Sequence, residues 1–141
     1  MPPRCTVLVV DDDTDIRESV RLLLEIEDYP VLEAQDGAIA LQILLRSTMP
    51  LVVLVDYMMP QMNGLQLLRE VTRTQRLAQR HTYVLVTANY DRLPPGDSEV
   101  LAALDVGRVK KPFDIDTLLD VVERACQSLA RNRVVSTVFA P

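Results

Sequence analysis

The sequence predicts an α/β protein with an open parallel sheet that is covered by helices on both faces. Five short apolar segments suit buried strands, and they alternate along the chain with five segments whose apolar residues recur at helical spacing. Such alternation implies right-handed crossovers between parallel strands. With 141 residues, of which 48% are hydrophobic, the chain is long enough to form one domain with a sizeable core.

The predicted strands are runs of β-branched and other apolar residues, which suit strands that are buried on both faces. They span residues 6–10, 31–34, 51–55, 83–86 and 108–110. Turn-forming pairs, such as Asp36-Gly37 and Asn63-Gly64, lie between strands and helices. No internal repeat or low-complexity linker interrupts the pattern. We therefore expect one continuous sheet.

The predicted helices show apolar residues at a spacing of three to four. The first carries Ile16, Val20, Leu23 and Leu24 on one face and ends before Tyr29-Pro30, because the residue before a proline disfavours the helical region. Three further helices are predicted at residues 38–45, 65–71 and 98–104. The last helix begins near residue 115 and continues to about residue 129.

Composition and charge argue against several classes of protein. The formal net charge is −5, whereas binding to nucleic acid phosphates needs clustered Lys and Arg. The apolar runs are far shorter than the roughly 20 residues of a membrane span, and residues 1–5 do not resemble a secretory signal. We expect a cytoplasmic protein that binds neither nucleic acid nor membrane. Cys5 and Cys126 have no metal-ligand spacing and are predicted to be reduced.

Polar residues follow four of the predicted strands at the point where each strand ends. In an open parallel sheet these carboxyl ends share one edge, where ligands bind. The residues are Asp11 and Asp12, Asp56, Thr87 with Ala88, and Lys111. Three converging carboxylates repel one another unless a cation neutralises them, and oxygen ligands of this kind favour Mg²⁺ over zinc. The sequence therefore predicts a magnesium site next to a hydroxyl and an ammonium that suit a phosphoryl group.

Four segments carry these residues: VLVVDDD, LVDYMMPQMNG, LVTAN and KKPF. Together they resemble the receiver domains of bacterial response regulators, and the resemblance covers residues 6 to about 129. It implies a flavodoxin-like fold, a three-layer (βα)5 sandwich with strand order 2-1-3-4-5. It further implies a receiver domain at residues 5–130, similar to stand-alone chemotaxis regulators. Residues 131–141 are expected to form a tail without a separate output domain.

The resemblance assigns a role to each residue at the strand ends. Asp56 is expected to accept the phosphoryl group and to bind Mg²⁺ together with Asp12 and the backbone carbonyl of Met58. Asp11 is expected to hold a magnesium-bound water. Because Met58 contributes its carbonyl, an apolar side chain is tolerated at that position.

The other half of the expected site holds the phosphoryl oxygens. Thr87 and the backbone amide of Ala88 are expected to bind them, while Lys111 pairs with the acyl phosphate. Lys111-Pro112 is expected to be a cis peptide. Lys110 is interpreted as a solvated neighbour, and Asp13 as a helix cap or a solvent-facing residue rather than a metal ligand.

The sequence departs from the family in the segment that follows Thr87. Many relatives carry an aromatic residue three positions before the lysine, whereas this chain has Arg108, and its loop at residues 91–97 is long and proline-rich. We expect phosphorylation to reorganise this loop, with Tyr90 as a possible substitute for the missing ring. His81, the only histidine, is interpreted as a loop residue away from the carboxylates.

The resemblance implies that a sensor histidine kinase or a histidine phosphotransfer protein supplies the phosphoryl group. Output is expected by docking to an unidentified effector protein, from a monomer or a weak homodimer, and not by catalysis on other substrates. Two alternatives remain: a pseudo-receiver that binds partners without phosphorylation, and a magnesium-dependent phosphohydrolase. The second is disfavoured, because such enzymes commonly need a carboxylate where this chain has Met58. The apolar residues of the tail leave open whether it frays or pairs as a strand.

Overall fold

A parallel sheet forms the middle layer of the protein. The computed structural model describes the backbone of residues 4–88 and 95–139, with side chains for residues 4–88 and 96–131. Within this part, five strands pair in the order β2-β1-β3-β4-β5. They are β1 (Thr6–Val10), β2 (Val31–Ala34), β3 (Leu51–Asp56), β4 (Thr82–Thr87) and β5 (Gly107–Lys110). The predicted fold class and strand order are confirmed.

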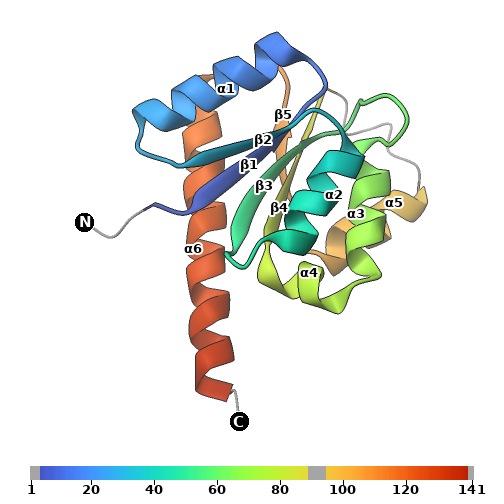
Figure 1. The fold of residues 1–141 in the computed structure, drawn as a ribbon, viewed down its shortest axis with the longest axis vertical. Helices are drawn as coiled ribbons and strands as arrows, with labels where there is room; N and C mark the ends of the chain where they lie inside the picture. The colour runs from blue at the N-terminus through green and yellow to red at the C-terminus, as the bar shows by residue number, and fades with distance from the viewer. Residues whose placement is uncertain (1–3, 89–94, 140–141) are drawn as a thin grey trace.

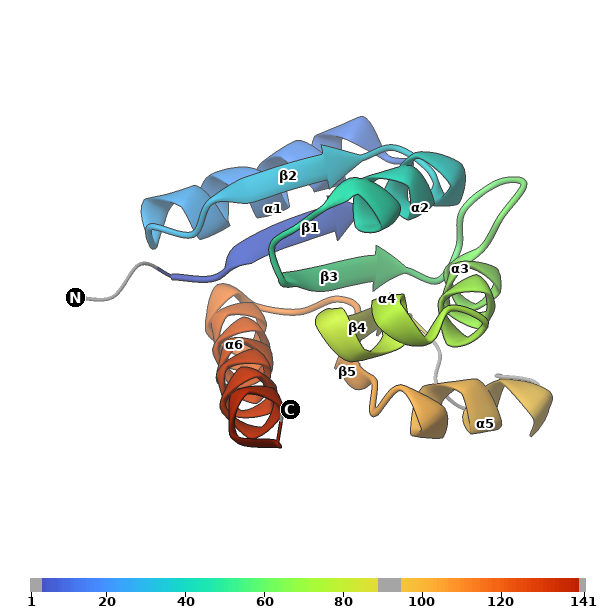
Figure 2. The same cartoon turned by 60° about the horizontal axis from the view of Figure 1, so that its bottom comes forward.

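Helices cover both faces of the sheet (Figures 1 and 2). In the described part of the chain they are α1 (Thr14–Ile26), α2 (Gly37–Arg46), α3 (Gly64–Thr72), α4 (Gln75–Arg80), α5 (Pro95–Ala103) and α6 (Ile115–Phe139). α1 and α6 pack on one face, and α2 to α5 pack on the other. The molecule is therefore a three-layer sandwich.

The core lies in two clusters, one on each side of the sheet. All six residues of β3 are buried, and successive side chains enter opposite clusters because the side-chain period of a strand is two. Val53 and Val55 pack under α2 and α3, whereas Val52 and Leu54 pack under α1 and α6. This burial on both faces holds β3 in the centre, and with it Asp56 at the strand's carboxyl end.

Side-chain caps fix the starts of α1, α2 and α3. Asp13 accepts hydrogen bonds from the backbone N–H groups of Asp15 and Ile16, which confirms its predicted role as the cap of α1. Asp36 accepts from Ile39 N–H at 2.8 Å at the start of α2. Asn63 and Gln66 form a reciprocal capping box on α3. These caps fix where each chain segment leaves the edge of the sheet that carries the aspartates.

One helix was not predicted, and two others begin or end well outside their predicted bounds. α4 was not predicted, since its six residues are mostly polar and only Leu77 among them is buried. α5 starts at Pro95 instead of residue 98, because proline suits the first turn of a helix. α6 continues to Phe139, so the backbone of most of the predicted tail is helical rather than extended. None of the helices in the described ranges is long and apolar enough to span a membrane.

The prediction of two reduced cysteines was wrong. A disulfide joins Cys5, just before β1, to Cys126 in α6, and their Cα atoms lie 5.9 Å apart. The two residues are 121 positions apart in the sequence, so no local spacing pattern indicated the pair. They meet because the chain enters β1 beside the face of the sheet that α6 covers.

His81 lies in the connection between α4 and β4, as predicted for a loop residue, but it is buried. It follows α4, and only 3% of its surface is exposed. Its Nδ1 atom accepts a hydrogen bond from Leu51 N–H at 3.0 Å, which ties α4 to the start of β3. Burial is the main cause that lowers the pKa of His81 to about 4; a backbone interaction with Leu44 opposes the shift, and the nearby charge of Arg80 adds to it. As predicted, the residue lies away from the carboxylates, at the other end of β3.

The neutral state of His81 predicts an acid-sensitive fold. Between pH 6.5 and about 4 the unfolded chain binds a proton that the folded chain excludes, so stability falls as the pH falls. We expect this residue to remove about 2 kcal/mol of unfolding free energy between pH 7 and pH 5. Urea titrations at both pH values would measure it. His81→Asn keeps an acceptor near the position of Nδ1 but cannot titrate, so its unfolding free energy should fall less between pH 7 and pH 5. An equal fall in wild type and variant would assign the effect to other groups.

Candidate functional site

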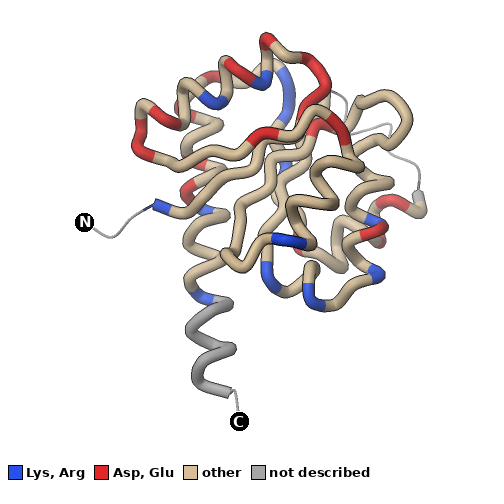
Figure 3. Tube along the Cα trace, in the orientation of Figure 1, with Lys and Arg blue, Asp and Glu red and all other residues tan. Residues whose placement is uncertain are grey.

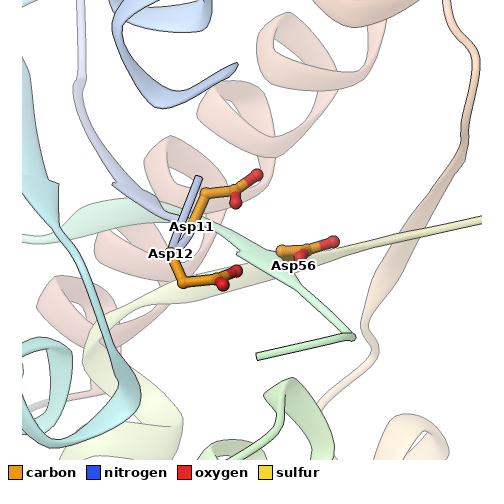
Figure 4. Close-up of side chains that lie close together, drawn as sticks. All are labelled: Asp11, Asp12 and Asp56. Carbon is orange, nitrogen blue, oxygen red and sulfur yellow. The ribbon is translucent and has the colours of Figure 1, made fainter. Parts of the chain in front are cut away.

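Strand register brings the predicted acidic residues together at one edge of the sheet. β1 and β3 pair with Val10 opposite Val55. The residues that follow these two, Asp11 and Asp56, therefore lie side by side. Ligand oxygens of Asp11, Asp12 and Asp56 all lie within 4.8 Å of one another. Figure 4 shows the three carboxylates directed into the same space from the ends of β1 and β3.

Lys111 supplies a positive charge beside this cluster. Its Nζ atom donates a hydrogen bond to Asp56 Oδ1 at 3.1 Å and lies 3.7 Å from Asp11 Oδ2. Its backbone N–H donates to the Thr87 carbonyl at 2.9 Å, which fixes the segment after β5 against the end of β4. The Lys111-Pro112 peptide is cis, as predicted. Lys110 is exposed, in agreement with its interpretation as a solvated neighbour.

The carboxylates differ in their surroundings. Asp11 and Asp56 are 5% and 7% exposed, whereas Asp12 is exposed. Burial raises the pKa of Asp56 above its ordinary value, although the hydrogen bond from Lys111 opposes the shift. Burial also raises the pKa of Asp11, against a 2.9 Å hydrogen bond from Asp13 N–H. The cluster therefore favours a bound cation, which would offset the cost of burying these charges.

A largely apolar hollow adjoins the two buried carboxylates. Side chains of α1 and α6 form its walls, together with Phe113 from the segment that leads into α6. Ile16, Val20 and Leu118 are among the lining residues, and Asp11, Asp56 and Lys111 lie at its polar end.

The three carboxylates fit a hard divalent cation. They offer only oxygen donors, at the spacing that a single ion requires, and two of them come from adjacent residues of one chain segment. Histidine and cysteine ligands of the kind that zinc prefers are absent from this cluster. Mg²⁺ is commonly bound by one or two carboxylates plus phosphate oxygens, and this set supplies those carboxylates.

The remaining predicted residues lie at the same edge. Thr87 is buried as the last residue of β4, and Ala88 follows it at the exposed end. Met58 is 71% exposed. Arg108 is exposed on β5. Tyr90 and most of the loop at residues 91–97 lie outside the described residues, and their expected rearrangement remains a prediction.

Two supporting residues were not identified from the sequence. The Arg17 guanidinium donates to the Asp11 carbonyl at 2.8 Å and to Glu33 of β2 at 3.2 Å, which fixes the turn that presents Asp11 and Asp12. Gly64 starts α3 directly against β3, where an added Cβ atom would lie 2.6 Å from the Asp56 carbonyl oxygen. Its place in the Asn63-Gly64 pair suggested only a turn.

Gly64→Ala is expected to destabilise the protein by about 2 kcal/mol, because the new methyl group meets backbone and Val55 rather than a movable side chain. Gly37→Ala is the matched control, also at the start of a helix. Its Cβ would meet the flexible end of Met62, so its cost should stay below about 1 kcal/mol. Denaturant titrations of both variants measure the decrease in unfolding free energy. If the two decreases are equal, the close approach of the backbone to Asp56 is not the reason for glycine at position 64.

Charges are distributed unevenly around this site. Figure 3 shows acidic residues in the turn before α1 and along α1, where basic residues stand between them, while several basic residues gather near α4 on the other face of the sheet. Asp15 and Glu18 are exposed on α1 and extend the acidic character of Asp11 and Asp12. Such a surface attracts cations to the mouth of the site and repels polyanions.

Comparisons with known proteins agree with this geometry. MprA, a response regulator of Mycolicibacterium vanbaalenii, is 41% identical over 122 residues, which cover 84% of this chain and 48% of MprA. The chain therefore spans about half the length of the curated relatives it matches.

Two solved structures resemble the whole fold. The chemotaxis protein CheY4 of Vibrio cholerae superposes with a TM-score of 0.72 and 28% identity, covering 86% of this chain and 98% of CheY4. A CheY-like receiver domain protein of Methanospirillum hungatei gives a TM-score of 0.72 and 27% identity, covering 91% and 96%.

A family model gives the most direct assignment. The model of the response regulator receiver domain matches residues 7–123, a range that contains Asp11, Asp12, Asp56, Thr87 and Lys111. Members of this family act in two-component signalling, generally with histidine kinases, and are typically signalling modules rather than enzymes. The resemblance drawn from the sequence motifs is thereby confirmed, and the chain belongs to the family of response regulator receiver domains.

Proposed function

We propose that this domain is a phosphorylation switch in which Asp56 accepts a phosphoryl group from a phosphohistidine of a partner kinase or phosphotransfer protein. The observation that carries the proposal is the position of Asp56. An oxygen of its carboxylate lies within 4.8 Å of oxygens from two further carboxylates, and its Oδ1 atom lies 3.1 Å from the Lys111 ammonium. A nucleophile that adjoins both a candidate cation site and a fixed positive charge suits phosphoryl transfer.

In the proposed reaction an Asp56 oxygen attacks phosphorus, the bond from phosphorus to the donor nitrogen breaks, and an acyl phosphate forms. Asp12, Asp56 and the Met58 carbonyl would hold Mg²⁺ directly, with Asp11 holding one of its waters; when bound, the ion supplies positive charge against the phosphoryl oxygens. Lys111 would neutralise charge on the acyl phosphate. Thr87 and the Ala88 amide, at the end of β4, would bind the remaining oxygens.

The signal is proposed to leave the domain through protein docking. Phosphorylation adds charge at the edge of the sheet, and an effector that binds only the phosphorylated form shifts the population toward it. The acidic surface around α1 argues for a protein partner rather than nucleic acid. We propose that this takes place in the cytoplasm, where histidine kinases act, and that the domain is a monomer or a weak homodimer.

Acetyl phosphate provides a direct test, because it donates a phosphoryl group without a kinase. We expect intact-mass spectrometry to show one added phosphoryl group per chain with magnesium and none in chelator. Folded protein that never gains this mass would indicate a pseudo-receiver. Steady release of phosphate from a general ester such as p-nitrophenyl phosphate would indicate the phosphohydrolase. Beryllofluoride, which mimics the phosphoryl group, should likewise bind only with magnesium.

A further inference from the structure

The disulfide between Cys5 and Cys126 is not used by the phosphorylation site. With 5.9 Å between their Cα atoms, the two residues fall within the range that an unstrained backbone allows for a disulfide. Both are half-buried and pack against the core cluster under α1 and α6. The bond therefore lies at the rim of the core, within reach of a small thiol, rather than deep inside it.

The bond joins the two chain segments that lead to the phosphorylation site. From Cys5 the chain runs directly into β1, which ends next to Asp11. From Cys126 the chain leads back along α6, which begins four residues after Lys111. α6 also supplies Leu118 and Val122 to the core over the sheet. The disulfide thus fixes α6 to the sheet at the end opposite to the aspartates.

The fold does not depend on this bond in the way that a small secreted domain does. Fully buried residues, such as Val7, Val52 and Val122, fill the cluster around the two cysteines, and a domain of this length buries enough apolar surface to fold without a cross-link. The structure is therefore compatible with both the oxidised and the reduced pair. A bond of this kind in a compartment that keeps thiols reduced is typically redox-sensing.

We propose that Cys5 and Cys126 are a redox-modifiable pair that cross-links α6 to β1 when the surrounding thiol pool is oxidised and releases α6 when it is reduced. The substrate class is a small-molecule disulfide such as glutathione disulfide. The cytoplasmic setting comes from the proposed function, but the pairing itself comes from the geometry of these two residues.

The exchange balances without any further reagent. The thiolate of one cysteine attacks glutathione disulfide, a mixed disulfide forms, and one glutathione leaves. The thiolate of the other cysteine then attacks the mixed disulfide at the protein sulfur, and the second glutathione leaves. Two electrons pass from the two protein thiols to glutathione disulfide, and the two thiol protons end on the two reduced glutathione molecules.

Glutathione buffers of fixed ratio test the proposal. Reduced and oxidised samples of the wild-type protein are each equilibrated in the buffer, their free thiols are alkylated, and their masses are measured by mass spectrometry. We expect the same cross-linked fraction from both starting samples. Because the bond closes a loop of more than 100 residues, the oxidised form should melt about 10 °C higher than the reduced form. Hydrogen exchange in the second half of α6 should be faster in the reduced form.

Matched variants complete the test. Cys5→Ser and Cys126→Ser should each have the same melting temperature in the reducing and in the oxidising buffer. Asp56→Asn should show the wild-type difference in melting temperature between the two buffers, so the result does not depend on phosphorylation. A cross-link that persists in excess reduced glutathione would make the bond purely structural and overturn the proposal. Cysteines that stay as free thiols in excess glutathione disulfide, or equal melting temperatures of the oxidised and reduced forms, would also overturn the proposal.

Discussion

Replacing Asp56 by asparagine is expected to reduce phosphoryl incorporation from acetyl phosphate at least about 1,000-fold. The amide keeps the size of the side chain but loses the nucleophilic oxygen and the negative charge that pairs with Lys111. The measurement is the rate of mass gain in saturating magnesium, with circular dichroism to show that the variant is folded. A variant that gains a phosphoryl group at the wild-type rate would exclude Asp56 as the acceptor.

Asp13→Asn is the matched control for this experiment. It removes one negative charge from the same acidic turn, but Asp13 caps α1 through its side-chain oxygen, and asparagine caps a helix equally well. Phosphorylation and stability of this variant should therefore stay near the wild-type values. Together the two variants separate loss of the acceptor from a general loss of acidic charge.

The double variant Asp11→Asn with Asp12→Asn is expected to weaken magnesium binding at least about 100-fold. In wild type, magnesium should raise the melting temperature, because the ion binds the folded state. In chelator the double variant should melt higher than wild type. The raised pKa of Asp11 means that its charged form is unfavourable in the folded state, and this cost is present at any pH above that pKa.

Thermal melts in magnesium and in chelator measure both effects. Asparagine at position 11 keeps an oxygen that can accept the hydrogen bond from Asp13 N–H, so the turn should be preserved. Asp15→Asn with Glu18→Gln is the control: both residues are exposed on α1 outside the carboxylate cluster, so their loss should weaken the magnesium response far less than the change at positions 11 and 12. A double variant at positions 11 and 12 that still gains stability from magnesium would place the ion elsewhere.

The predicted strands proved close to the observed ones because their signal is local. Residues 6–10 and 31–34 are strands with the predicted bounds, and β3 differs by one residue. Since the carboxyl ends of parallel strands share an edge, the order of elements alone was enough to bring Asp11, Asp12, Asp56 and Lys111 together. The family resemblance added roles that the residue types alone left open.

The features that were missed depend on contacts between distant parts of the chain. His81 is buried because it binds Leu51, 30 residues away, and nothing next to it in the sequence indicates that partner. The Cys5–Cys126 pair depends on which face of α6 meets the start of β1. α4 has too few apolar residues to show a helical period. In each case tertiary packing decided the outcome.

The contact of Lys111 with both Asp11 and Asp56 makes the site partly neutral before any ion arrives. Loading magnesium would then be an ion exchange, in which the incoming cation competes with a tethered ammonium. The apparent affinity for magnesium would be the affinity of the free carboxylates multiplied by the fraction of time that the ammonium leaves them free. The ammonium therefore raises the free magnesium concentration that is needed to fill the site. In the ion-free protein it also reduces the repulsion between the carboxylates.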